Sequence, residues 1–96
     1  RGVIHAYSGS LQQAENLLKI NFSFGFGTSL TNPHAYKLHD IVKFLPIESI
    51  VIETDDRKNP DELIQVAERV ARIKKITVDQ VIEQCDQNTF NIFKIS

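Results

Sequence analysis

The chain alternates short apolar runs with amphipathic helical patterns, and this alternation constrains the fold more than any other feature. The apolar runs predict strands at residues 3–7, 22–27 and 49–54, and each run is followed by apolar residues spaced three or four apart. Strand–helix–strand units of this kind pair their strands in parallel through right-handed crossovers. The sequence therefore predicts an α/β fold with a parallel sheet.

Capping signals indicate where two of the helices begin. Ser10 with Gln13, and Thr77 with Gln80, have the spacing of a capping box. In that arrangement the hydroxyl accepts a backbone N–H while the glutamine side chain reaches back to the cap. We expect helices to start at these two positions. The helical tail at residues 88–93 is expected to be anchored by two phenylalanines, Phe90 and Phe93.

Asparagine–proline pairs indicate the other helix starts. Asn32 and Pro33 are expected to begin a helix that Pro46 ends, and Asn59 and Pro60 are expected to begin the next one. The helical residues expected to face the core are Leu11, Ala14, Leu17 and Leu18; Leu38, Ile41, Val42 and Leu45; Leu63, Val66, Ala67, Val70 and Ile73; and Val78, Val81, Ile82 and Cys85.

Length and composition narrow the class of protein. A closed (β/α)8 barrel usually needs about 250 residues, whereas this chain has 96 and no methionine, so Arg1 is not expected to be a translation start. Twelve acidic residues against eleven basic ones give no global field to hold DNA or an anionic membrane. The single cysteine, Cys85, excludes an internal disulfide, and no run is long enough for a membrane span. A soluble, cytoplasmic protein with no membrane partner is expected.

A three-stranded arc with its helices on one face leaves the other face of the sheet uncovered. We expect Val3, Phe24 and Val51, or their neighbours, to be exposed there. Burial of apolar surface stabilises a fold by about 25 cal/mol per Å², so leaving these side chains exposed loses several kcal/mol of stabilisation. The arc is therefore expected to need a partner, either an upstream part of the protein or a second copy.

Two chemically active residues come at the ends of predicted strands. His5 lies in V-I-H-A-Y-S-G and Asp55 in I-V-I-E-T-D. The carboxyl ends of parallel strands meet at one edge of the sheet, and imidazole nitrogen and carboxylate oxygen are good ligands for divalent metals. The residues by themselves leave alternatives open, since a histidine can be a hydrogen-bonded core residue and an aspartate a turn or cap residue.

The same stretches resemble the TatD-like metal-dependent hydrolases. G-V-I-H-A-Y-S-G-S-L-Q-Q-A is similar to that family's stretch around a ligand histidine, I-V-I-E-T-D to its final barrel strand, and Q-N-T-F-N-I-F to its closing segment. F-S-F-G-F-G-T-S-L-T-N and R-K-N-P-D-E-L also match in order and spacing. The resemblance implies that residues 1–96 are the C-terminal part of a TIM (β/α)8 barrel, with about three βα units and a final helix, in a longer single domain.

The resemblance also implies an activity. His5 would be a metal ligand, and Asp55 a metal ligand that also takes a proton from water as general base. One or two divalent ions (Mg, Mn or Zn) would serve the hydrolysis of DNA phosphodiester bonds. The remaining ligands, an H-x-H pair, a glutamate and another histidine, would come from the N-terminal part of the barrel. The 96-residue chain alone is therefore expected to be inactive.

Some positions depart from the family pattern. Ala6 and Tyr7 stand where cysteine and phenylalanine are usual, and both are expected to pack rather than react. Ser8 and Arg57 are expected to contact substrate phosphate, with a turn residue and a solvated residue as the alternatives. The loop after Asp55 is shorter than is usual in the family, which affects the rim that selects substrate.

Other conspicuous residues are expected to have structural roles. Glu53 is expected to make a supporting hydrogen bond rather than to ligate a metal. His34 and His39, on the second helix, are expected at solvated or rim positions. Gly25 and Gly27 lack the spacing of a dinucleotide site and are expected to allow close backbone approach.

Two alternatives to a deoxyribonuclease remain open from the sequence. The first is a non-catalytic scaffold that keeps the arc without the chemistry. The second is an amidohydrolase-class enzyme acting on a non-nucleic substrate, which the short loop after Asp55 allows.

Overall fold

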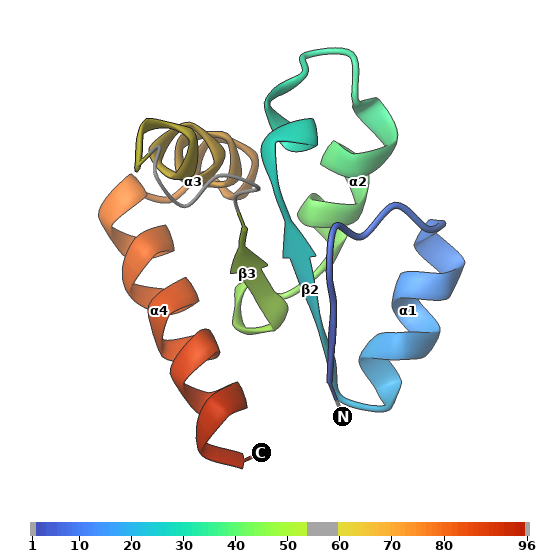
Figure 1. Ribbon diagram of the computed structural model, residues 1–96. Helices are drawn as coiled ribbons and strands as arrows, with labels where there is room; N and C mark the ends of the chain where they lie inside the picture. The colour runs from blue at the N-terminus through green and yellow to red at the C-terminus, as the bar shows by residue number, and fades with distance from the viewer. Residues whose placement is uncertain (1, 54–59, 96) are drawn as a thin grey trace.

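The computed structural model describes residues 2–53 and 60–95 (Figure 1). In chain order the elements are β1 (Gly2–Ile4), α1 (Leu11–Lys19), β2 (Phe22–Phe26), η1 (Thr28–Thr31), α2 (Tyr36–Phe44), η2 (Ile47–Ser49), β3 (Ile50–Ile52), α3 (Pro60–Lys74) and α4 (Val78–Ile95). The strands form one sheet in the order β1-β2-β3, and both pairs are parallel. The predicted α/β class is confirmed.

The first and third strands are shorter than predicted. β1 ends at Ile4 because Ala6 adopts a left-handed conformation with φ of 48°, which turns the chain out of the strand. β3 begins at Ile50, since Ser49 belongs to the short helix η2. The pairing of β3 with β2 nevertheless extends beyond β3, because the Glu53 N–H donates to the Phe26 carbonyl at 2.8 Å.

Both predicted capping boxes are present. The Ser10 hydroxyl accepts the Gln13 N–H at 3.1 Å, and the Gln13 side chain accepts the Ser10 N–H at 2.9 Å. Thr77 and Gln80 make the same reciprocal pair before α4, at 3.1 and 2.9 Å. These local signals place the two helix starts correctly.

The predicted start of α2 is wrong by three residues. The Asn32 side chain accepts the His34 N–H at 2.9 Å, so it closes a turn instead of capping a helix. The helix cap is Ala35, and α2 begins at Tyr36. His34 therefore precedes α2 and is not part of it. Asn59 lies outside the described residues, and α3 begins at Pro60.

The core lies between the sheet and the helices that surround it. β2 reads F-S-F-G-F, and the fully buried Phe24 and Phe26 face the helices. Because side chains alternate across a strand, Ser23 and Gly25 face the other side of the sheet. The expectation that Val3, Phe24 and Val51, or their neighbours, are exposed is wrong for Phe24 and Val51, and Val3 is half-buried. Phe24 points into the helical core, and Val51 is buried in β3, against which α4 packs.

Helix α4 runs alongside β3 and η2 as one continuous helix (Figure 1). Its buried Asn88 donates from Nδ2 to the carbonyls of Ile47 (2.8 Å) and Ile50 (2.7 Å). Ile82 and Phe90 are 37% and 60% exposed, so the predictions that Ile82 is buried and that Phe90 anchors the tail are wrong. Both residues lie off the stripe of α4 that contacts the sheet. The side chain of Phe93 lies outside the described part.

The structure also tests the expectations about the cysteine and about membrane-spanning segments. Cys85 is buried in the core as predicted, and burial raises the pKa of its thiol to about 12. No helix in the described ranges, 2–53 and 60–95, is both long enough and apolar enough to span a membrane.

Candidate functional site

His5 lies at the carboxyl end of β1, at the edge of the sheet where the ends of all three parallel strands meet. The chain turns sharply after it, because Ala6 is in the left-handed region and the Tyr7 N–H returns to the Gly25 carbonyl at 2.9 Å. This turn leaves the His5 side chain 79% exposed. The predicted placement of His5 at a strand end is therefore what the structure shows.

The Glu53 carboxylate contacts both His5 and the turn after it. Its Oε1 is hydrogen-bonded to His5 Nδ1, and its Oε2 accepts the Ala6 N–H at 2.8 Å. The Glu53 backbone is fixed in turn by its bond to Phe26. The sequence predicted a supporting hydrogen bond for Glu53 but not its partner, which lies 48 residues away in the chain.

Gly25 makes this contact possible. A Cβ atom at this position would lie only 2.3 Å from the Glu53 carboxyl carbon, whereas a Cβ at Gly27 would meet nothing closer than 3.4 Å. The Glu53 side chain therefore passes directly over Gly25 on its way from β3 to β1. The close approach expected at Gly25 is confirmed, but it is made by a side chain rather than by backbone.

Tyr7 supports the turn from inside the core. Its buried ring packs edge-on against Phe24 and Phe26, with centroids 5.1 and 6.3 Å away. Its hydroxyl donates to the Ser10 carbonyl at 2.6 Å, and burial raises the pKa of Tyr7 above its ordinary value. The expected packing is confirmed for Tyr7, whereas Ala6, for which it was also expected, is exposed.

A small cavity of about 80 Å³ adjoins Glu53, and three of the residues that line it are serines or threonines. The exposed Ser8 lines it from the loop after β1, and Thr28 and Ser29 line it from the start of η1. Sequence reasoning singled out Ser8 alone. Thr28 and Ser29 could have been found by the same signal, because they follow β2 as Ser8 follows β1.

The other two histidines contact residues other than His5 and Glu53. His34 is exposed and packs edge-on with Tyr36, at a centroid distance of 6.1 Å. His39 is half-buried, and its Nε2 is hydrogen-bonded to the Leu30 carbonyl at 3.0 Å. Within residues 2–53 and 60–95, no three His, Cys, Asp or Glu side chains are grouped closely enough to hold a metal ion.

His5 has the properties of a metal ligand in its surroundings. Because Glu53 takes up Nδ1, the second ring nitrogen, Nε2, is left for a ligand on the exposed side of the ring. Metal-binding histidines commonly have a carboxylate on the other nitrogen in this way. The described residues thus offer one candidate ligand, His5. Asp55 and Arg57 lie outside the described part of the chain.

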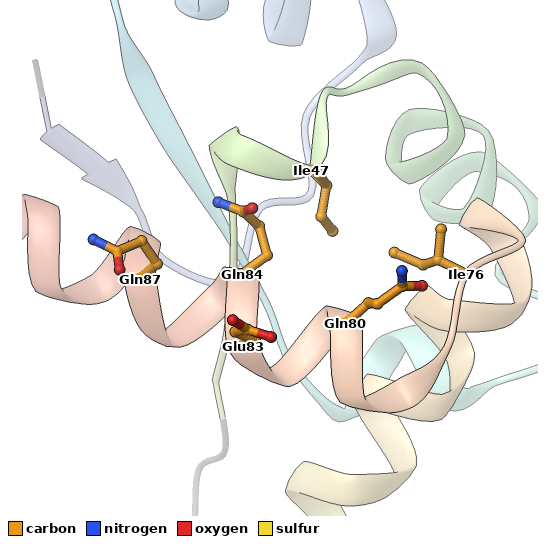
Figure 2. A pocket seen from close by; sticks show the side chains of 6 residues that line it. All are labelled: Ile47, Ile76, Gln80, Glu83, Gln84 and Gln87. Carbon is orange, nitrogen blue, oxygen red and sulfur yellow. The ribbon is translucent and has the colours of Figure 1, made fainter.

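A larger groove elsewhere does not suit a metal. It has a volume of about 440 Å³ and is lined by Ile47, Ile76, Gln80, Glu83, Gln84 and Gln87 (Figure 2). Four of these residues come from α4, and Glu83 supplies the only carboxylate among them. One carboxylate among neutral amides makes a poor site for a catalytic ion such as zinc, which usually has about three imidazole, thiolate or carboxylate ligands. His5 remains the candidate ligand.

The three parallel strands, each followed by a helix, form an arc of a (β/α)8 barrel, with a histidine at the edge where barrel enzymes place their chemistry. The family model described as TatD related DNase matches residues 1–94, and the chain belongs to this family. The predicted resemblance and the partial-barrel fold are confirmed.

Individual relatives agree with this assignment. The chain is 29% identical to the metal-dependent hydrolase YjjV of Escherichia coli over 98% of its own length, and 29% identical to YabD of Bacillus subtilis over 99%. The crystal structure of YjjV superposes on 95% of the chain with a TM-score of 0.84. A TatD family hydrolase from Entamoeba histolytica, 18% identical, shares the fold with a TM-score of 0.79.

The chain spans about 40% of the length of these relatives. The shares covered are 40% of YjjV and 42% of YabD, and 39% and 41% of the two solved chains. Both YjjV and YabD are named as metal-dependent hydrolases.

Proposed function

We propose that residues 1–96 are the C-terminal part of a single-domain, divalent-metal-dependent hydrolase that cleaves DNA phosphodiester bonds in the complete protein. The observation that carries the proposal is the exposed His5 at the strand ends, with one ring nitrogen bound to Glu53 and the other, Nε2, making no hydrogen bond within residues 2–53 and 60–95. Membership of a family described as TatD related DNase supports the substrate. A cytoplasmic location stays a prediction.

In this proposal His5 and Asp55 hold the metal, whether Mg, Mn or Zn and whether one ion or two. Such an ion would supply Lewis-acid chemistry, because a bound divalent cation lowers the pKa of water. Asp55 would be the general base that accepts the proton. His5 contributes a neutral nitrogen donor whose orientation is fixed from behind by Glu53.

Ser8 and Arg57 are proposed to contact the substrate phosphate. Ser8 is exposed at the same edge of the sheet as His5 and shares a cavity with Glu53, which supports a place at the rim of the site. A guanidinium suits phosphate because it offers several donors in a planar fork.

The test uses the complete protein that contains this chain. We expect it to release nucleotides from single-stranded DNA with Mg, Mn or Zn, and we expect His5→Ala and Asp55→Asn to lower kcat/KM by at least about 100-fold, as loss of an essential catalytic interaction does. A matched His34→Ala variant should keep its activity, because His34 is exposed and its ring contacts Tyr36 rather than His5 or Glu53. DNA hydrolysis that survives in both site variants would rule out the proposal.

We also propose that the 96-residue chain has no activity by itself. His5 and Asp55 give two protein ligands, fewer than the three typical of a catalytic zinc site. The missing ligands come from the N-terminal part of the barrel, which is its structural partner. Metal-dependent nucleotide release by the isolated chain, lost in His5→Ala, would contradict this.

A further inference from the structure

We infer that Glu53 is the positioning residue of the site: it fixes His5 in the tautomer that carries hydrogen on Nδ1 and so aims a free Nε2 lone pair outward. The inference rests on the proposed function, in which His5 binds a metal. It assigns to the glutamate of the I-V-I-E-T-D run a role distinct from that of a ligand.

The donor and acceptor groups of the two side chains determine the direction of the hydrogen bonds that Glu53 makes. A carboxylate has no N–H or O–H to give, so both oxygens of Glu53 act as acceptors. One oxygen accepts the Ala6 N–H, and the other therefore accepts a proton from His5 Nδ1. In the neutral ring, a hydrogen on Nδ1 leaves Nε2 unprotonated. That nitrogen is then available as a ligand.

Both ends of the contact are held in place by backbone bonds. The Glu53 N–H is bound to Phe26, and the Tyr7 N–H is bound to Gly25 at 2.9 Å, two residues after His5. The Glu53 side chain is only 23% exposed, whereas the His5 side chain is 79% exposed. The largely buried Glu53 carboxylate thus holds the exposed His5 ring in place.

The Glu53→Gln variant separates this role from general support of the fold. A glutamine has one acceptor oxygen and one donor NH2, so it cannot accept from both Ala6 and His5. If its oxygen keeps the Ala6 N–H, its NH2 faces Nδ1 and favours hydrogen on Nε2, where a metal would bind. We expect metal affinity to fall by about 10- to 100-fold, which is usual when the partner of a ligating histidine is lost.

A second variant disturbs the contact without changing Glu53. In Gly25→Ala the new Cβ would lie 2.3 Å from the Glu53 carboxyl group, the flexible end of a side chain, so the carboxylate must move while the strand is kept. Gly27→Ala is the matched control, because its Cβ would meet nothing closer than 3.4 Å. We expect Gly25→Ala to behave as Glu53→Gln does, and Gly27→Ala to behave as the wild type.

The experiment measures two quantities on the complete protein. The first is the Mn²⁺ or Zn²⁺ affinity, by calorimetry, of the wild type and of the His5→Ala, Glu53→Gln, Gly25→Ala and Gly27→Ala variants. The second is the tautomer of neutral His5 in the metal-free protein, from the ¹⁵N resonances of its two ring nitrogens. Circular dichroism checks that each variant is folded.

The expected result is a His5 ring with hydrogen on Nδ1 in the wild type and in Gly27→Ala, together with a loss of that tautomer and of affinity in Glu53→Gln and Gly25→Ala. A wild-type ring with hydrogen on Nε2, or equal affinities in all the folded glutamate and glycine variants, would overturn the inference. Failure of the proposed function looks different, since metal affinity would then be the same in the wild type and in His5→Ala.

Discussion

At the scale of single residues, the candidate site depends on a backbone turn that most side chains would disfavour. Ala6 has a φ of 48°, and left-handed geometry costs a residue with a Cβ about 1–2 kcal/mol. Two hydrogen bonds hold it there: the Ala6 N–H donates to Glu53, and the Tyr7 N–H donates to the Gly25 carbonyl. Nothing in the sequence signals this turn, because alanine is not a residue that favours positive φ.

The strain at Ala6 leads to a prediction. Ala6→Gly should stabilise the fold by up to about 1 kcal/mol, since the relief of about 1–2 kcal/mol exceeds the added entropy of the unfolded glycine chain. Chemical denaturation of both proteins measures the change. Destabilisation by more than about 1 kcal/mol would show that Ala6 is unstrained.

At the scale of elements, helix starts and stops follow local chemistry where the polar group is close in sequence. The two capping boxes are satisfied within four residues, so sequence spacing alone located them. Asn32 was misplaced because its side chain closes a turn with His34 in preference to capping a helix. The end of α3 is also local: Lys75 is left-handed with φ of 59°, and the Ile76 N–H bonds back to Ala71 at 3.0 Å.

At the end of α3, two glycine substitutions should change stability in opposite directions. Lys75→Gly should stabilise the chain by about 1 kcal/mol, because glycine favours the left-handed position after a helix. Arg72→Gly, three residues earlier and also exposed, should destabilise it by about 1 kcal/mol because it lies inside the helix. Thermal unfolding of the two variants should shift Tm in opposite directions, and a shift in the same direction would be inconsistent with this end of α3.

At the scale of the whole molecule, α4 is joined to the outer edge of the sheet by one buried side chain. Val51 and Glu53 direct their backbone groups toward β2, so the Ile50 carbonyl points to the free edge of β3. Asn88 satisfies that carbonyl and the one at Ile47, and its own oxygen accepts from Gln84 at 2.9 Å.

Removing the Asn88 side chain should lower the stability of the fold. Asn88→Ala leaves two carbonyls without a donor and should lower the free energy of unfolding by about 2–4 kcal/mol. Asn91→Ala, an exposed position on the same helix, should change it by no more than about 0.5 kcal/mol. Equal effects in urea denaturation would mean that Asn88 does not connect α4 to the sheet.

The buried thiol makes the stability of the whole fold sensitive to alkaline pH. Burial raises the pKa of Cys85 from 9.0 to about 12, so above pH 9 the unfolded chain loses its proton first. Stability is then lost as pH rises, by about 1.4 kcal/mol per pH unit up to the folded pKa. Cys85→Ala removes this contribution, and the difference between the two pH profiles of unfolding, measured from pH 7 to 11, should show that slope. Parallel profiles would exclude it.

The sequence by itself determined the order of the elements, both capping boxes, the parallel sheet and the position of His5 at a strand end. These follow from apolar periodicity and from polar groups a few residues apart. Only the tertiary structure decided which glutamate supports His5, why Gly25 has no side chain, and that Asn88 rather than Phe90 secures α4. Each of these pairs residues from different elements, and side-chain spacing along one element carries no information about what the neighbouring element presents to it.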